Sequence, residues 1–132
     1  HAVYHHEATG LDVIPGQQTN VNAADVFSSR RFKAFIDQAR ERYDFVVIDT
    51  PPALAVPDAR VIAPLVDAVL YCVRWNSTHR DLLRNGISAF EQIQVPVTGL
   101  VMTQIDLRKL ARYGYGGYNY YYYKSSSRYY LN

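Results

Sequence analysis

The feature that most constrains this chain is a run of four apolar residues, Phe45 to Ile48, that ends directly at Asp49. Three of the four residues are β-branched, which favours an extended strand. A continuous apolar run, unlike an alternating one, is typical of a strand that is buried on both faces of a parallel sheet. Thr50-Pro51-Pro52 follows, and the two prolines disfavour helix at that point. The run therefore predicts a central strand with a carboxylate at its carboxyl end.

Further strands and helices alternate with this run in the first 107 residues. Short apolar runs predict strands over 11–14, 68–73 and 97–102. Helices are expected after candidate N-caps at Asn22, Ser28 or Ser29, Asp58 and Thr78. This alternation predicts an α/β fold in which helices flank both faces of a parallel sheet through right-handed crossovers.

Composition supports one globular domain and narrows the class of function. Hydrophobic residues make up 48% of the 132 positions and charged residues 20%, which is typical of a chain with a packed core. The net charge of +2 does not indicate nucleic-acid binding. The single cysteine, Cys72, excludes an intrachain disulfide, and we expect it to be buried in its strand. No apolar run approaches the roughly 20 residues of a membrane helix, so we expect a soluble cytoplasmic segment.

The last twenty residues differ in kind, because tyrosine dominates them. Nine of the twelve tyrosines lie there: Tyr113, Tyr115, Tyr118, Tyr120, Tyr121, Tyr122, Tyr123, Tyr129 and Tyr130. Leu131 is the only aliphatic residue among them, so we expect a flexible tail over 108–132 after a globular part over 1–107. With only Lys124 and Arg128 as basic residues, nucleic-acid stacking is disfavoured. General contacts through aromatic stacking remain as one interpretation of this segment.

Asp49 is the strongest candidate for chemistry. Ligands of parallel α/β sheets bind beyond the carboxyl ends of the strands, where this residue is expected. A carboxylate there is suited to hold hydrated Mg²⁺ against nucleotide phosphates, because Mg²⁺ prefers oxygen ligands and keeps several waters. The alternative is that Asp49 only caps a turn.

The segment 43–52 resembles the Walker B segment of the MinD/ParA-like P-loop ATPases, and it is most similar to that of the bacterial tyrosine kinases (BY-kinases) of polysaccharide synthesis and export. Residues 10–16, Asp58-Ala59, and Val73-Arg74 followed by Thr78 also match this family. The tyrosine-rich terminus separates these kinases from other members. The phosphate loop Gly-x-x-x-x-Gly-Lys-Ser/Thr and the second acidic motif are absent. The chain therefore resembles the C-terminal portion of such a kinase domain and is expected to be an internal fragment.

The resemblance implies an ATP-dependent protein tyrosine kinase that uses Mg²⁺. Asp49 would be the catalytic residue and would hold Mg²⁺ through water, while Thr50, Pro51, Arg74 and Thr103 would contact the nucleotide. Relatives often place an adenine-reading asparagine near the last strand, where this chain has Thr103 followed by glutamine. Without the phosphate loop, the chain alone is expected to be inactive.

The resemblance also implies that the tail tyrosines accept phosphate in trans from a neighbouring subunit of a ring oligomer. Each phosphate adds roughly −1.5 to −2 charges, so graded phosphorylation could drive subunits apart. The implied partners are a membrane-anchored parent or partner protein and a phosphatase, at the cytoplasmic side of the bacterial inner membrane. The implied process is regulation of exopolysaccharide biosynthesis and export. The alternatives are a non-kinase ATPase switch of the same superfamily and a catalytically incomplete interaction module.

Overall fold

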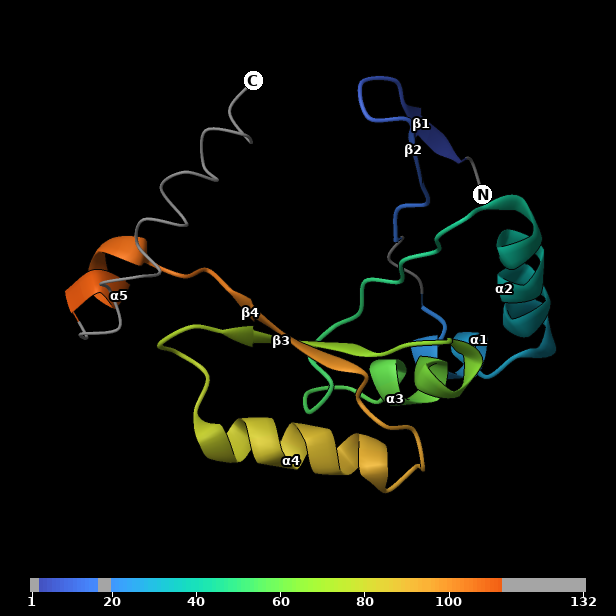
Figure 1. Ribbon diagram of the computed structural model, residues 1–132. Coiled ribbons are helices and arrows are strands. Elements are labelled where there is room, and N and C mark those ends of the chain that lie inside the picture. The colour runs from blue at the N-terminus through green and yellow to red at the C-terminus, as the bar shows by residue number, and fades with distance from the viewer. Residues whose placement is uncertain (1–2, 17–19, 113–132) are drawn as a thin grey trace.

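The computed structural model describes residues 3–16 and 20–112 of the chain. Its strands form two separate two-stranded sheets, one at each end of the described sequence. In chain order the elements are β1 (Tyr4–His6), β2 (Leu11–Val13), α1 (Ala23–Phe27), α2 (Arg30–Arg42), α3 (Asp58–Ile62), the 3-10 helix η1 (Ala63–Leu65), β3 (Leu70–Arg74), α4 (Arg80–Glu91), β4 (Gly99–Thr103) and α5 (Leu107–Arg112) (Figure 1).

The parallel pair β3–β4 confirms the predicted α/β architecture. The two strands align from Leu70 opposite Gly99 to Arg74 opposite Thr103, and α4 connects them. The helix runs alongside the two strands (Figure 1). This β-α-β arrangement is the unit from which parallel sheets are built. Both strands lie within two residues of the ranges that the apolar runs predicted.

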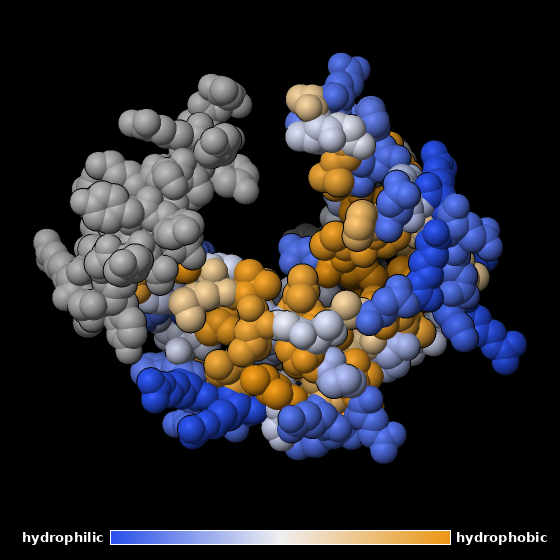
Figure 2. Space-filling view, in the orientation of Figure 1, coloured by the Kyte–Doolittle hydropathy of each residue, from blue (hydrophilic) through white to orange (hydrophobic). Residues whose placement is uncertain are grey.

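The core lies where α3, η1 and α4 meet β3. Ala53, Ala59, Ala63 and Phe90 form its buried cluster. The ring of Tyr71 packs edge-on against Phe90, with 6.3 Å between the ring centroids. Figure 2 shows that apolar residues also reach the surface in the middle of the molecule, so this small core does not bury them all.

Two of the predicted N-caps are confirmed by hydrogen bonds. The Asn22 side chain accepts from the Ala24 N–H at 3.2 Å and begins α1. The Ser29 hydroxyl accepts from the Phe32 N–H at 3.1 Å and begins α2, so Ser29 rather than Ser28 is the cap. Each bond satisfies a backbone donor that has no partner within its helix.

The other two predicted N-caps are wrong. The α3 N-cap is Pro57, and Asp58 is the first helical residue. The α4 N-cap is His79, because the hydroxyl of Thr78 instead accepts from the backbone N–H of Arg74 at 3.1 Å. A threonine hydroxyl bonds readily to nearby backbone, so the turn after β3 competes with the helix for it.

The apolar run at 45–48, expected to be a buried central strand, is irregular and largely exposed. Phe45 is 89% exposed and Val47 is 91% exposed. Between residues 44 and 51 the backbone forms no hydrogen bond to any other described residue. A strand requires a neighbour that pairs with its N–H and C=O groups, and no described strand lies in register with this segment.

The expected strand at 11–14 forms, but it joins a hairpin instead of the parallel sheet. β2 pairs antiparallel with β1, with His5 opposite Asp12. Gly10 closes the turn with φ +69°, and its N–H donates to the His6 carbonyl at 2.9 Å. Pairing across so short a loop costs little chain entropy, which explains why the local partner is chosen.

One further expectation is wrong, and the predicted boundary between the globular part and the tail stays a prediction. Cys72, expected in the core, is exposed, because it alternates with Tyr71 and Val73, whose side chains face the core. α5 crosses the predicted boundary between residues 107 and 108, while the nine tail tyrosines lie outside the described residues. Among the helices that the structure describes, none has the length and apolarity that crossing a membrane requires.

Candidate functional site

The carboxyl edge of the β3–β4 pair brings together two of the predicted nucleotide contacts. Arg74 and Thr103 are register partners at the last position of their strands. The N–H of Trp75 donates to the Thr103 carbonyl at 2.9 Å, which extends the pairing one residue further. The Thr103 hydroxyl donates to the Val73 carbonyl at a long 3.4 Å. Arg74 is exposed at this edge, so its guanidinium is accessible to an anionic ligand.

Two of the three non-glycine residues that have a positive φ in the described part of the chain lie at the same edge, and the third is Gln94 after α4. Asn76 and Gln104 follow β3 and β4 within two residues, and their φ angles are +53° and +55°. A left-handed backbone is unfavourable for residues other than glycine, by roughly 1 kcal/mol or more, although asparagine tolerates it best. Strained residues of this kind gather at ligand-binding loops. The two left-handed residues therefore give the loops after β3 and β4 defined turns at the carboxyl edge of the sheet.

The predicted residues Asp49, Thr50 and Pro51 lie on the irregular segment before α3. Asp49 and Pro51 are exposed and Thr50 is half-buried. The Asp49 carboxylate forms no hydrogen bond or ion pair with any described residue, Arg74 and Thr103 included. Its oxygens are thus accessible to the water shell of a metal ion, which is how Mg²⁺ is commonly held by one carboxylate.

The donor set fits only part of a magnesium–nucleotide site. Nowhere in the described ranges do three or more His, Cys, Asp or Glu side chains gather in a way that would hold a metal directly. The sequence also has no glycine followed by lysine, so the backbone cradle of a phosphate loop is missing. Asp49 can therefore contribute one carboxylate to a hydrated ion. Arg74 and Thr103 can contribute a guanidinium and a hydroxyl at the carboxyl edge of the two strands.

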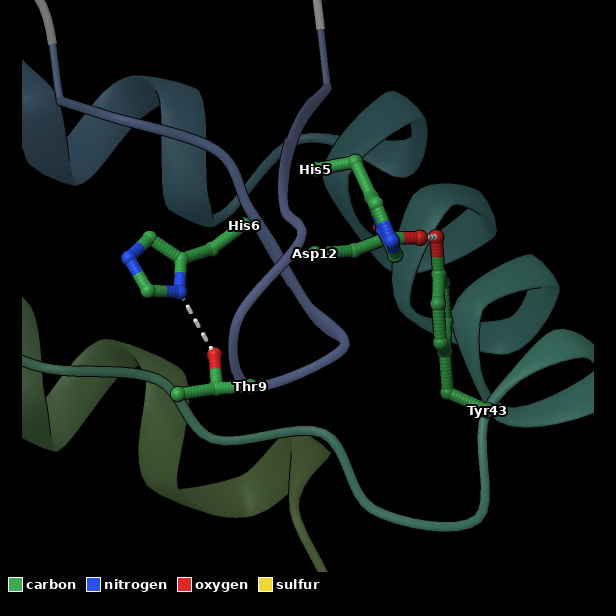
Figure 3. Close-up of polar contacts among 5 residues, drawn as sticks. All are labelled: His5, His6, Thr9, Asp12 and Tyr43. Carbon is green, nitrogen blue, oxygen red and sulfur yellow. Dashed lines mark hydrogen bonds and ion pairs between the residues drawn. The ribbon is translucent and has the colours of Figure 1, made fainter.

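A second polar cluster joins the hairpin to the end of α2 (Figure 3). The carboxylate of Asp12 lies between two partners: its Oδ1 is 2.6 Å from His5 Nδ1, and its Oδ2 accepts from the Tyr43 hydroxyl at 2.7 Å. The guanidinium of Arg42 lies 5.5 Å from the centre of the Tyr43 ring. His6 contacts Thr9 through a separate hydrogen bond of 2.8 Å within the hairpin.

This cluster shifts two ionisation equilibria in opposite directions. The hydrogen bond with His5, followed by the one from Tyr43, holds the pKa of Asp12 below its usual value. The hydrogen bond to Asp12 raises the pKa of Tyr43, because the phenol proton is held against a carboxylate. Sequence reasoning missed the cluster, since Asp12 and Tyr43 are 31 residues apart. A predicted hairpin that pairs His5 with Asp12 would have indicated only the first of the two contacts of Asp12.

The chain was compared with known proteins. No family model matches it. It is 39% identical over 104 residues to the tyrosine-protein kinase ptk of Acinetobacter johnsonii, which covers 79% of this chain and 14% of that protein. It is 35% identical over 116 residues to the tyrosine-protein kinase wzc of Salmonella typhi, covering 88% of this chain and 16% of the relative. The chain thus spans about a sixth of the length of these relatives.

Two further similarities widen the comparison. The tyrosine-protein kinase YwqD of Bacillus subtilis is 30% identical over 107 residues, which are 81% of this chain and 45% of that protein. Among solved structures, the kinase domain of VpsO superimposes with a TM-score of 0.74 at 32% identity, covering 79% of this chain and 51% of that domain. Sequence and fold similarity therefore agree on the same kind of protein.

Proposed function

Because this chain belongs to the family of bacterial tyrosine kinases of exopolysaccharide systems, we propose that the full-length protein is an ATP-dependent tyrosine kinase that phosphorylates its own C-terminal tyrosines. The observation that carries the proposal is the similarity to the VpsO kinase domain, which covers 79% of this chain at 32% identity. Relatives with this similarity are named tyrosine-protein kinases, and one is named a succinoglycan biosynthesis transport protein. We infer the same kind of role, in exopolysaccharide biosynthesis and export, for this protein.

Asp49 is the proposed catalytic residue. Its exposed carboxylate would bind the water shell of Mg²⁺, and the metal, when bound, supplies charge neutralisation at the phosphates of ATP. Thr50 and Pro51 continue the same segment and would contact the nucleotide. The phosphate cradle has to come from residues outside this chain, so we expect the 132-residue chain alone to be inactive.

Arg74 and Thr103 form the second proposed part of the nucleotide site. They lie side by side at the carboxyl ends of two parallel strands, which is where ligands bind in this class of sheet. Arg74 supplies an exposed positive charge for a phosphate. Thr103 is a weak candidate for reading adenine, since its hydroxyl donates to Val73 and retains only its acceptor capacity.

The tail tyrosines are the proposed phosphate acceptors. The phenol proton has a pKa of about 10, so transfer depends on bringing the hydroxyl into line with the γ-phosphoryl group. A tail on one subunit that enters the site of its neighbour would achieve this in a ring. We further propose a membrane-anchored parent or partner at the cytoplasmic side of the inner membrane, and a phosphatase that resets the tail.

The test of this proposal is Asp49→Asn in the full-length protein, with Asp44→Asn as the matched control. Both aspartates are exposed on the same segment, five residues apart. We expect phosphate incorporation into the tail to fall about 100-fold for Asp49→Asn, as on losing one preorganised charge contact, and to be unchanged for Asp44→Asn. Mass spectrometry of the tail peptides after incubation with MgATP measures the incorporation. Equal incorporation in both variants would contradict the catalytic role of Asp49, whereas an unmodified tail in the parent protein would favour the non-kinase ATPase switch.

A further inference from the structure

We propose that Thr78 is a positioning residue for Arg74 and fixes the direction from which its guanidinium reaches a nucleotide phosphate. The inference rests on the proposed role of Arg74 as a phosphate contact. It assigns a function to the turn between β3 and α4 (Figure 1), which uses the Thr78 hydroxyl that would otherwise be free to cap the helix.

Thr78 binds both backbone groups of Arg74. Its hydroxyl accepts from the Arg74 N–H at 3.1 Å, and its own N–H donates to the Arg74 carbonyl at 3.1 Å. The chain returns to Arg74 within four residues because Asn76 adopts a left-handed backbone, with φ +53°. Thr78 is half-buried, while Arg74 is exposed. The turn is therefore a closed ring with Arg74 at its base.

The opposite edge of the strand is held by β4. The N–H of Trp75 donates to the Thr103 carbonyl at 2.9 Å, so this group points toward β4. The backbone groups of successive strand residues point to opposite edges, which places those of Arg74 on the edge away from β4. Thr78 lies on that edge. The end of β3 is thus bonded by Thr103 on one side and by Thr78 on the other.

A backbone held in this way sets the direction of the Cα–Cβ bond of Arg74. The remaining freedom of the guanidinium is that of the side-chain torsions. Without the Thr78 hydroxyl, the ring keeps one of its two bonds, and the Arg74 side chain starts from a wider range of directions. Its contact with a phosphate then weakens, because binding has to restrict this added freedom. Contacts with other parts of the nucleotide are not affected.

Two substitutions of Thr78 test the contact in the full-length protein. Thr78→Val replaces the hydroxyl by a methyl group of similar size, and Thr78→Ser keeps the hydroxyl. The probe is MgADP, which has phosphates but no γ-phosphoryl group to transfer, and titration calorimetry measures its Kd. We expect Arg74→Ala to raise this Kd by about 10-fold, as on losing one hydrogen bond to a charged group. Thr78→Val should raise it by a smaller factor, about 5-fold.

Two matched controls should keep the parental Kd for MgADP. Thr78→Ser retains the bond to the Arg74 N–H, so it should restore what Thr78→Val loses. Ser77→Ala removes the neighbouring hydroxyl of the same turn, which is exposed, and leaves both bonds of Thr78 in place. An increase in Kd for either control equal to that for Thr78→Val would overturn the inference.

A positioning residue has to act through Arg74. In the Arg74→Ala background, Thr78→Val should therefore cause no further increase in Kd, whereas independent contributions would add. Adenosine, which has no phosphate, should bind to every variant with the parental Kd. Additive losses, or an equal loss of adenosine binding, would overturn the inference, because either result would indicate general damage to this edge of the sheet.

Hydrogen exchange at the Arg74 amide reports on the bond itself without any ligand. Thr78→Val should accelerate this exchange and Thr78→Ser should not. Faster exchange together with a parental Kd for MgADP would show that the bond does not position the guanidinium, and only the role of Thr78 would then be wrong. An unchanged Kd for Arg74→Ala would remove the proposed phosphate contact and this inference with it. The kinase function is tested separately, by Asp49→Asn.

Discussion

The β3–α4–β4 unit and the segment 44–51 have similar apolar sequences but different structures. The strands of the unit align over five residue pairs, and Tyr71 of β3 packs on Phe90, which is 2% exposed. The segment has three consecutive β-branched residues at 46–48, yet it is unpaired and exposes Phe45 by 89%. The difference teaches that an apolar run encodes a tendency to be a strand, while a partner at hydrogen-bonding distance decides whether the strand forms.

The largest expected difference in the free energy of unfolding comes from replacing one phenylalanine by alanine in each of the two regions. Phe90→Ala should lower the free energy of unfolding by about 3–5 kcal/mol, because it leaves a cavity in the core. Phe45→Ala should change it by less than about 0.5 kcal/mol, as is usual for exposed positions. Denaturant unfolding of both variants measures the contrast. A loss of several kcal/mol for Phe45→Ala in the full-length protein would break the comparison and show that another element covers this segment there.

A smaller effect is expected at Gly86 of α4, against which the ring of Tyr71 from β3 lies. A side-chain carbon at this position would collide with the hydroxyl of Tyr71. Gly86→Ala should therefore destabilise the fold by about 1–3 kcal/mol, the usual cost of overpacking. Adding Tyr71→Phe removes the nearest atom and should recover part of the loss. Thermal unfolding of the single and double variants checks this, and strictly additive losses would show that the two residues do not meet.

The smallest effect concerns pH and the attachment of the hairpin. Since folding lowers the pKa of Asp12, its contribution to stability is present above about pH 4 and is lost as the pH falls through the lowered value. Since folding raises the pKa of Tyr43, its contribution is present below about pH 10 and is lost as the pH rises through the raised value. Amide exchange at residues 4–13 across both limits measures the attachment. Asp12→Asn should reduce the pH dependence of amide exchange at both the acid and the alkaline limit. An unchanged pH dependence would mean that other groups hold the hairpin.

Much of the β3–α4–β4 unit could be predicted from the sequence, because its elements are specified locally. The apolar runs placed both strands to within two residues of where they form. The caps at Asn22 and Ser29 were also predictable, since a side-chain oxygen needs only a backbone N–H two or three residues away. The Thr78 cap was not, because the turn after β3 competes for the same hydroxyl.

Part of the candidate site could also be predicted from the sequence and part could not, because only some of its features are specified locally. The positions of Arg74 and Thr103 follow from the parallel register of their strands, so their neighbourhood at the carboxyl edge could be expected. The environment of Asp49 could not, because it depends on whether the preceding run is paired. The bond between Asp12 and Tyr43 was also missed, as it joins a hairpin and a helix end that share no sequence pattern.

The sequence by itself determined the local elements of this protein, its family, and the residue types available at the strand ends. It did so because periodicity, capping and motif spacing involve residues that are close along the chain. The tertiary structure alone decided that 45–48 stays unpaired, that 11–13 folds back on 4–6, and that Asp12 contacts Tyr43. These outcomes depend on which distant groups come within hydrogen-bonding reach, and that competition is settled only when the whole chain folds.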